Sequence, residues 1–78
     1  MESSVKNILV DVFDIKEADI SNEMNLRDIE SWDSLKHMNL VVSLEQQFNI
    51  EFSTEEIIEM KKLNDLYNIL KRKDIQAQ

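Results

Sequence analysis

The sequence predicts an all-α fold: a small four-helix bundle of three longer helices and one short helix, with a long loop between the first two. Apolar residues recur at helical spacing in separate windows, and no segment of useful length alternates as a strand does. The chain has no proline, so ring geometry interrupts none of these windows. With 78 residues, we expect residues 1–78 to form a single domain with a modest core.

The first helix is predicted over about residues 3–14. One helical face is formed there by Val5, Ile8, Leu9 and Val12, with Phe13 beside it. Ser3 or Ser4 is the expected N-cap, because a serine hydroxyl can accept a hydrogen bond from a free N–H of the first turn.

Residues 15–33 lose the helical period and form a long predicted loop in which polar residues dominate. A loop of this length in a small domain is usually functional or is packed down by its own side chains. Leu26 and Ile29, three positions apart, are the residues expected to pin this loop to the core.

The second helix, over about residues 34–48, carries two apolar stripes. The stripe expected to face the core contains Leu40, Val41, Leu44 and Phe48. The second stripe, rotated away from the first, contains Leu35, Met38 and Val42. A surface helix needs only one apolar face. The second stripe therefore contacts other helices or is exposed for a partner.

The last third of the chain predicts two more helices. Ser53 and Glu56 form a Ser-x-x-Glu capping box, which begins a short helix over about 54–60 with Ile57 and Met60 facing inward. The final helix, over about 63–73, is indicated by the spacing of Leu63, Leu66, Tyr67 and Leu70. The basic residues near its end suit the helix dipole and require no ligand.

Composition excludes several classes of function. The absence of cysteine excludes disulfides, thiol catalysis and cysteine-type zinc sites, and no metal site is expected. The absence of glycine excludes a glycine-rich phosphate loop. A net charge of −7 provides solubility, repels nucleic acid and anionic membranes, and attracts basic protein surfaces. No signal-peptide pattern or membrane-length apolar run occurs, so a cytoplasmic location is expected.

Ser34, at the predicted start of the second helix, has three possible roles. As a nucleophile it would use His37, which shares its helix face, and Asp33. Asp33 is adjacent to Ser34 and poorly placed to orient His37, so catalysis is disfavoured and His37 is expected to face solvent. As part of the helix start, Asp33 is the expected cap, with Ser34 in the first turn. As an attachment point, Ser34 would place a linked phosphate among free N–H donors at the positive end of the helix dipole.

A family resemblance favours attachment. Asp33-Ser34-Leu35, at the start of an amphipathic helix in an acidic four-helix domain, resembles the acyl carrier protein family. The resemblance covers almost the whole chain, including its length, long first loop and short third helix. It is close in the stretch Leu40-Val41-Val42-Ser43-Leu44-Glu45-Gln46-Gln47-Phe48.

The resemblance implies that Ser34, in its Asp33–Leu35 motif, carries a 4′-phosphopantetheine arm added from coenzyme A by a separate phosphopantetheinyl transferase. The thiol of this arm would hold acyl groups as thioesters, which also explains the absence of cysteine. The protein would not be an enzyme. Its expected partners are acyl-transferring, ligating or synthase enzymes with basic docking surfaces, in fatty-acid, polyketide-like or other specialised acyl pathways. A monomer is expected.

The resemblance also assigns surfaces. It places Leu35, Met38 and Val42 on the outward side near the arm, where partners dock. The candidates for steering basic partners are Glu45, Glu55 and Glu56, which are otherwise simply solvated. The residues expected to border the space that shelters an acyl chain in related proteins are Leu44, Ile57 and Met60.

The chain departs from the pattern of many fatty-acid carriers around the motif. Ser31 stands where those carriers have glycine, and Lys36 and His37 stand where they have acidic residues. Trp32 is expected to pack over the loop or to touch the arm. Ile57 and Leu66 are bulky, which predicts less room for a long chain and a short or specialised acyl group. The alternatives are a peptidyl or aminoacyl carrier, which shares the fold and arm, and an unmodified helical adaptor.

Overall fold

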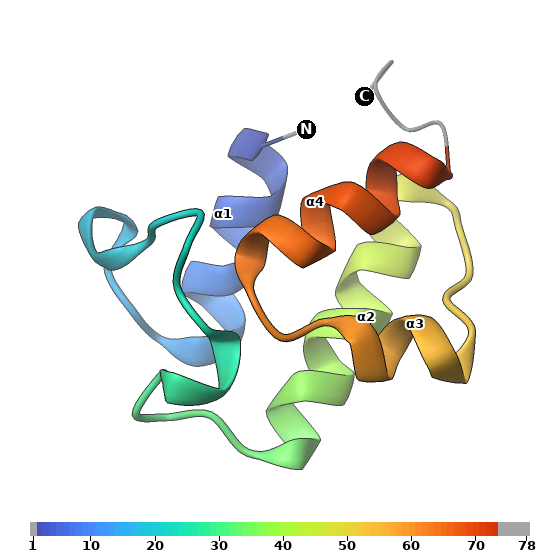
Figure 1. The fold of residues 1–78 in the computed structure, drawn as a ribbon. Coiled ribbons are helices and arrows are strands. Elements are labelled where there is room, and N and C mark those ends of the chain that lie inside the picture. Colours follow the sequence, from blue (N-terminus) through green and yellow to red (C-terminus); the bar gives the residue numbers. More distant parts are fainter. Residues whose placement is uncertain (1, 74–78) are drawn as a thin grey trace.

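The computed structural model describes residues 2–73. The elements follow one another as α1 (Glu2–Phe13), η1 (Glu17–Asp19), η2 (Leu26–Asp28), α2 (Ser34–Phe48), α3 (Thr54–Glu59) and α4 (Leu63–Arg72) (Figure 1). The residues described contain no strand, which confirms the all-α prediction with three longer helices and one short helix. No helix in this part of the chain is long and apolar enough to cross a membrane.

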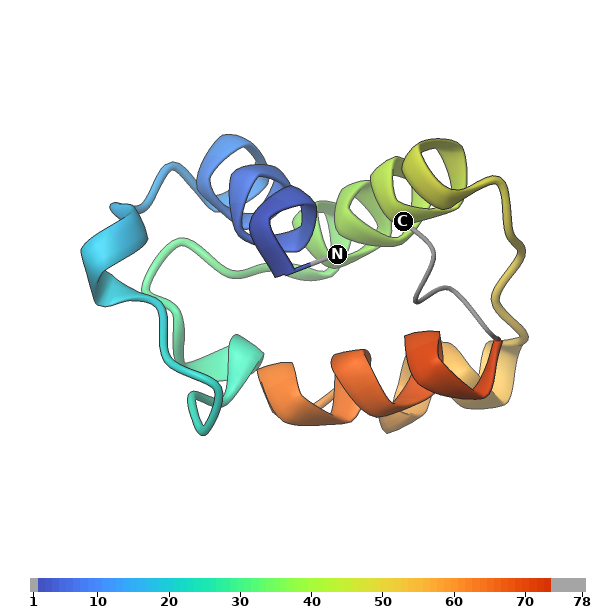
Figure 2. The ribbon, with the colours of Figure 1, turned by 90° about the horizontal axis from the view of Figure 1, so that it is seen from above.

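The helices form two layers around one core. Figure 2 shows α1 and α2 on one side and α3 and α4 on the other, with the long loop at one end. The fully buried core residues include Val5, Leu9, Phe13, Leu40, Leu44, Leu63, Leu66 and Leu70. Burial of these periodic apolar faces is what stabilises helices of such modest length.

The beginning of α1 differs from the prediction. The helix begins at Glu2, so Ser3 and Ser4 lie inside its first turn and neither is the N-cap. A serine is favoured at a cap, but propensity cannot fix a boundary to one or two residues.

The long loop between α1 and α2 is held to the rest of the protein by side chains and by main-chain bonds. Leu26 and Ile29 are buried, as predicted. The Leu26 N–H donates to the Lys61 carbonyl (2.7 Å), and the Leu63 N–H donates to the Met24 carbonyl (3.1 Å). These bonds join the loop to the connection between α3 and α4, so the segment that leads to Ser34 starts from a fixed point.

Two turns are made without glycine, which the chain lacks. Asp14, after α1, and Asn49, after α2, have positive φ angles of 54° and 55°. Aspartate and asparagine tolerate this left-handed conformation better than most residues. After Asn49, the Ile50 N–H donates to the Glu45 carbonyl (3.1 Å), which closes the end of α2 in the manner of a Schellman motif.

The predicted capping box at the start of α3 is present. The Ser53 hydroxyl accepts the Glu56 N–H (3.2 Å), and the Glu56 carboxylate accepts the Ser53 N–H (2.9 Å). Met60, just after the helix, is fully buried, and Ile57 is half-buried against the core. The inward orientation predicted for these two residues is confirmed.

Candidate functional site

Ser34 is the first residue of α2 and is exposed. The preceding residue, Asp33, has extended backbone, and its Oδ1 accepts the Lys36 N–H at 2.7 Å. The prediction that Asp33 is the cap and Ser34 lies in the first turn is therefore confirmed. Because Asp33 supplies the cap, the helix does not need the Ser34 hydroxyl for this purpose.

The surroundings of Ser34 fit a negatively charged phosphate ester. The first N–H groups of a helix have no intrahelical partner, and the Asp33 side chain satisfies only that of Lys36. The first turn of α2 contains no acidic residue and includes Lys36. The partial positive charge of the helix terminus adds to this field. A phosphate linked to Ser34 would thus meet free N–H donors, and the Asp33 carboxylate that caps this turn is bonded to the Lys36 N–H.

His37 does not face solvent, so that prediction was wrong. Its side chain is only 6% exposed. The Trp32 indole Nε1–H donates to His37 Nδ1 (3.4 Å), and His37 Nε2 lies 3.4 Å from the Ile57 carbonyl oxygen. His37, Leu40 and Leu44 are spaced i, i+3 and i+7, so His37 extends the buried stripe. Its polarity, rather than its spacing, led to the wrong expectation.

The His37 contacts also argue against a Ser–His catalytic pair. Nδ1 of the ring faces Trp32, and Nε2 faces the Ile57 carbonyl. No hydrogen bond joins His37 to Ser34 in the described chain. Trp32 is half-buried and packs against the core. The Trp32 and His37 rings are tilted by 59° with their centroids 6.0 Å apart, and the Arg27 guanidinium lies 5.6 Å from the Trp32 ring.

The outward stripe of α2 is open to solvent. Leu35, Met38 and Val42 are 71%, 45% and 44% exposed, whereas Leu40, Leu44 and Phe48 are buried. The two stripes therefore face in different directions, as the family resemblance implied. Ile58 of α3 is a further large apolar residue at the surface, with 58% exposed. Sequence spacing did not identify Ile58, because α3 is too short to show a full helical period.

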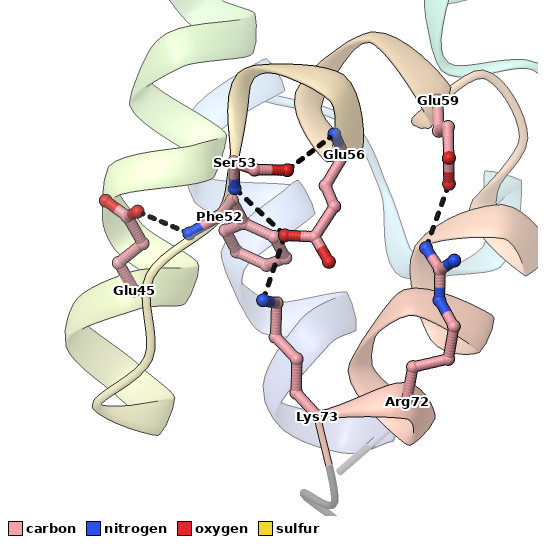
Figure 3. Close-up of polar contacts among 7 residues, drawn as sticks. All are labelled: Glu45, Phe52, Ser53, Glu56, Glu59, Arg72 and Lys73. Atoms are coloured by element: carbon pink, nitrogen blue, oxygen red, sulfur yellow. Dashed lines mark hydrogen bonds and ion pairs between the residues drawn. The ribbon is translucent and has the colours of Figure 1, made fainter.

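The three carboxylates considered for partner steering differ in their contacts (Figure 3). Glu45 Oε2 accepts the Phe52 N–H (2.9 Å), so this side chain holds the turn between α2 and α3. Glu56 closes the α3 capping box and pairs with Lys73 Nζ at 2.9 Å. Glu55 is exposed on the first turn of α3. Two of the three candidates thus also serve the fold.

The contacts of Glu56 change its acidity. The Ser53 N–H, followed by the Lys73 ammonium, lowers the pKa of Glu56 from its ordinary value of 4.5. Both donors favour the ionised carboxylate, because each stabilises negative charge.

The residues considered for sheltering an acyl chain are packed together. Leu44, Met60 and the bulky Leu66 are fully buried, and Ile57 is half-buried. One surface pocket is lined by Phe13, Asp14, Ile15, Glu30, Ser31 and Lys36. A second pocket is lined by Glu59, Lys61, Asp65, Asn68, Ile69 and Arg72. Neither pocket is lined by Leu44, Ile57 or Met60.

Comparison with known proteins identifies the family of the chain. The family model described as "phosphopantetheine attachment site" matches residues 3–70. An acyl carrier protein of Coprothermobacter proteolyticus is 36% identical over 66 residues, which cover 85% of this chain and 80% of that protein. An acyl carrier protein of Buchnera aphidicola subsp. Acyrthosiphon pisum is 29% identical over 76 residues, with 97% and 95% covered.

The fold and the matches define a non-catalytic carrier domain of the phosphopantetheine-binding class. The chain belongs to the acyl carrier protein family. It carries acyl groups on 4′-phosphopantetheine and works with partner enzymes that act on these groups. The resemblance noted at Asp33-Ser34-Leu35 is thereby confirmed at the level of the family.

Proposed function

We propose that Ser34 is the residue to which the phosphopantetheine arm is attached. The observation that supports this most directly is the exposed Ser34 hydroxyl at the first position of α2, beside a cap that Asp33 already supplies. A transferase can reach this hydroxyl without disturbing the helix start. The free N–H groups of the first turn would then face the new phosphate.

The attachment is a phosphoryl transfer in which Ser34 supplies the nucleophile. Its Oγ attacks the pantetheine-bearing phosphorus of coenzyme A, the pyrophosphate P–O bond breaks, and 3′,5′-ADP leaves. The hydroxyl proton passes to a base of the phosphopantetheinyl transferase, since His37 is occupied by Trp32 and Ile57. Once attached, the arm supplies the thiol that holds acyl groups as thioesters.

The surface beside Ser34 supports a docking role. Leu35, Met38 and Val42 form an exposed apolar stripe on the helix that begins at Ser34. We propose that this stripe contacts the transferase and the acyl-transferring, ligating or synthase enzymes. Glu55, together with the charges of Glu45 and Glu56, would steer their basic surfaces.

Intact-protein mass spectrometry tests the attachment directly. Wild type, Ser34→Ala and Ser21→Ala are incubated with coenzyme A and a broad-specificity phosphopantetheinyl transferase. Ser21 is an exposed serine of the long loop and serves as the matched control. We expect the mass of wild type and Ser21→Ala to increase by one phosphopantetheine group, while Ser34→Ala stays unchanged.

The opposite result is equally clear. If the Ser34→Ala variant, shown to be folded by circular dichroism, gains the group, another residue is the attachment point. If no variant gains it while a known carrier in the same tube does, Ser34 is only a helix-start residue and the unmodified adaptor becomes the better explanation.

A further inference from the structure

His37 is a polar side chain in an otherwise apolar interior, and it joins three parts of the molecule. It lies on α2, one helical turn from Ser34, and contacts Trp32 of the loop and Ile57 of α3. An indole N–H can only donate, so Nδ1 of His37 accepts from Trp32. The proton of the neutral ring is then on Nε2, where it can be donated to the Ile57 carbonyl oxygen.

His37 lies between Ser34 and the residues considered for the acyl space. Ser34, His37, Val41 and Leu44 are spaced i, i+3, i+7 and i+10, so they follow one face of α2. Leu44 lies about 15 Å from Ser34 along the helix axis at ~1.5 Å per residue, and His37 lies between the two residues. The contact with Ile57 bridges α2 to α3 at this point.

The interior behind His37 is filled. Leu44, Met60 and Leu66 have no exposed surface. Displacement of His37 would leave the Trp32 N–H and the Ile57 carbonyl in an apolar environment with one partner fewer. Close-packed interiors do not accept extra methylenes without such rearrangement.

We propose that His37, held by Trp32 and Ile57, closes the route between α2 and α3, so this carrier keeps its acyl group outside the bundle. His37 is a specificity-determining residue in this proposal. The acyl groups that suit such a carrier are short or polar ones, which lose little when they stay in water. The proposal rests on Ser34 being the attachment site.

The first test measures how the lability of the thioester depends on chain length in the wild-type protein. Butanoyl, octanoyl and dodecanoyl forms are prepared with the transferase and confirmed by intact mass. Hydroxylamine then attacks the thioester carbonyl, which releases the free thiol of the arm and an acyl hydroxamate. Each rate is divided by the rate for the corresponding acyl coenzyme A, which corrects for intrinsic reactivity.

We expect the corrected rates of the wild-type protein to be the same for all three chains. Even if the acyl chain were inside the bundle for ~10% of the time, the rate of thioester cleavage by hydroxylamine would fall by only about a tenth. In His37→Ala the route is open, so the dodecanoyl form should react about tenfold more slowly than the butanoyl form if the chain is inside for ~90% of the time.

Two further variants separate the role of His37 from a general loss of packing. In His37→Gln the side-chain amide can still donate to the Ile57 carbonyl, so we expect corrected rates like those of wild type. In Gln47→Ala the change lies at an exposed position of α2 outside the docking stripe, so we expect the corrected rates to be independent of chain length. Circular dichroism checks that each variant is folded. If His37→Ala does not fold, the wild-type and His37→Gln series still test the proposal.

Strong protection of the dodecanoyl form in wild type would overturn the proposal, as would unchanged rates in a folded His37→Ala. Failure of the arm to attach at all would appear earlier, in the mass measurement. That result would instead contradict Ser34 as the attachment site, so the two failures are distinguishable.

Discussion

Leu35 and Leu44 are the same residue type on the same helix, but their surroundings are opposite. Leu35 is 71% exposed beside Ser34, whereas Leu44 is fully buried. Leu44→Ala should destabilise the protein by about 2–5 kcal/mol, because the lost contacts leave a cavity. Leu35→Ala should change the free energy of unfolding by less than about 0.5 kcal/mol. Urea titration followed by circular dichroism measures both values.

The same pair of variants tests the docking surface. If the exposed stripe contacts partners, Leu35→Ala should weaken binding to the phosphopantetheinyl transferase although its stability is retained. A stability loss larger for Leu35→Ala than for Leu44→Ala would mean that the two stripes of α2 had been assigned to the wrong faces.

The residue scale also shows where inference from sequence fails. Spacing places His37 in the same stripe as Leu40 and Leu44, but an ionisable ring is usually assigned to the surface. Burial is acceptable here because Trp32 and Ile57 supply a donor and an acceptor. Both partners come from other segments of the chain, so no local pattern around His37 reveals them.

At the scale of the element, α3 depends on its ends. None of the residues Thr54–Glu59 is fully buried, and of these residues Ile57 packs half-buried against the core. Its capping box holds the first turn, and two ion pairs connect it to the end of α4 (Figure 3). Arg72–Glu59 is more than half exposed and contributes little. Lys73–Glu56 is mostly shielded, and Lys73 also lies 5.5 Å from the Phe52 ring.

The lowered pKa of Glu56 predicts a pH dependence of stability. The folded pKa is lower than the unfolded one, so the unfolded state binds more protons in this range and stability rises with pH. The contribution of Glu56 is present above its ordinary pKa of 4.5 and is lost as pH falls through the lower folded value. We therefore expect Glu56→Gln to lower the melting temperature at pH 7, and this difference from wild type to shrink at pH 3.

Glu55→Gln is the matched control, since it removes the same charge from the neighbouring exposed position. Its melting temperature should differ less from that of wild type at pH 7. A constant difference between wild type and Glu56→Gln at all pH values would show that the carboxylate charge has no role in holding α3.

Much of this element-level organisation could be predicted from the sequence. The bounds expected for α2 are those observed, because Asp33, the apolar stripes and the polar residue Asn49 mark both ends locally. The Ser53–Glu56 box marks the start of α3 for the same reason. Such signals lie within a few residues of the feature that they predict.

The remaining features depend on contacts between distant segments. The main-chain bonds between the loop and the α3–α4 connection have no side-chain signature, because any residue except proline can donate them. The Glu45 contact with Phe52 and the Glu56 pair with Lys73 arise only once the helices are placed. Ser34, the outward stripe and Glu45 were therefore named from the sequence, but the burial of His37 and the contact of Glu45 with Phe52 were not predicted.

At the scale of the whole molecule, charge and size act together. The chain carries a net charge of −7, and its described part has a radius of gyration of only 11.4 Å. The Debye length is about 10 Å at 0.1 M salt, so acidic groups repel one another across the molecule when salt is low. Only two ion pairs between side chains oppose this repulsion in the described residues, and one of them is exposed.

Added salt should therefore raise the melting temperature. Near 1 M sodium chloride the Debye length falls to about 3 Å, which removes most of the repulsion between distant carboxylates. A gain of about 1 kcal/mol in the free energy of unfolding would raise the melting temperature by roughly 4–8 °C for a domain of this size.

A double variant, Glu23→Gln with Glu51→Gln, removes two exposed negative charges, so its melting temperature should rise less with added salt. Calorimetry of both proteins at low and high salt provides the comparison. A melting temperature that does not change with salt in the wild type would mean that repulsion is not a significant term in the folded state, and that the acidic surface matters for partner recognition alone.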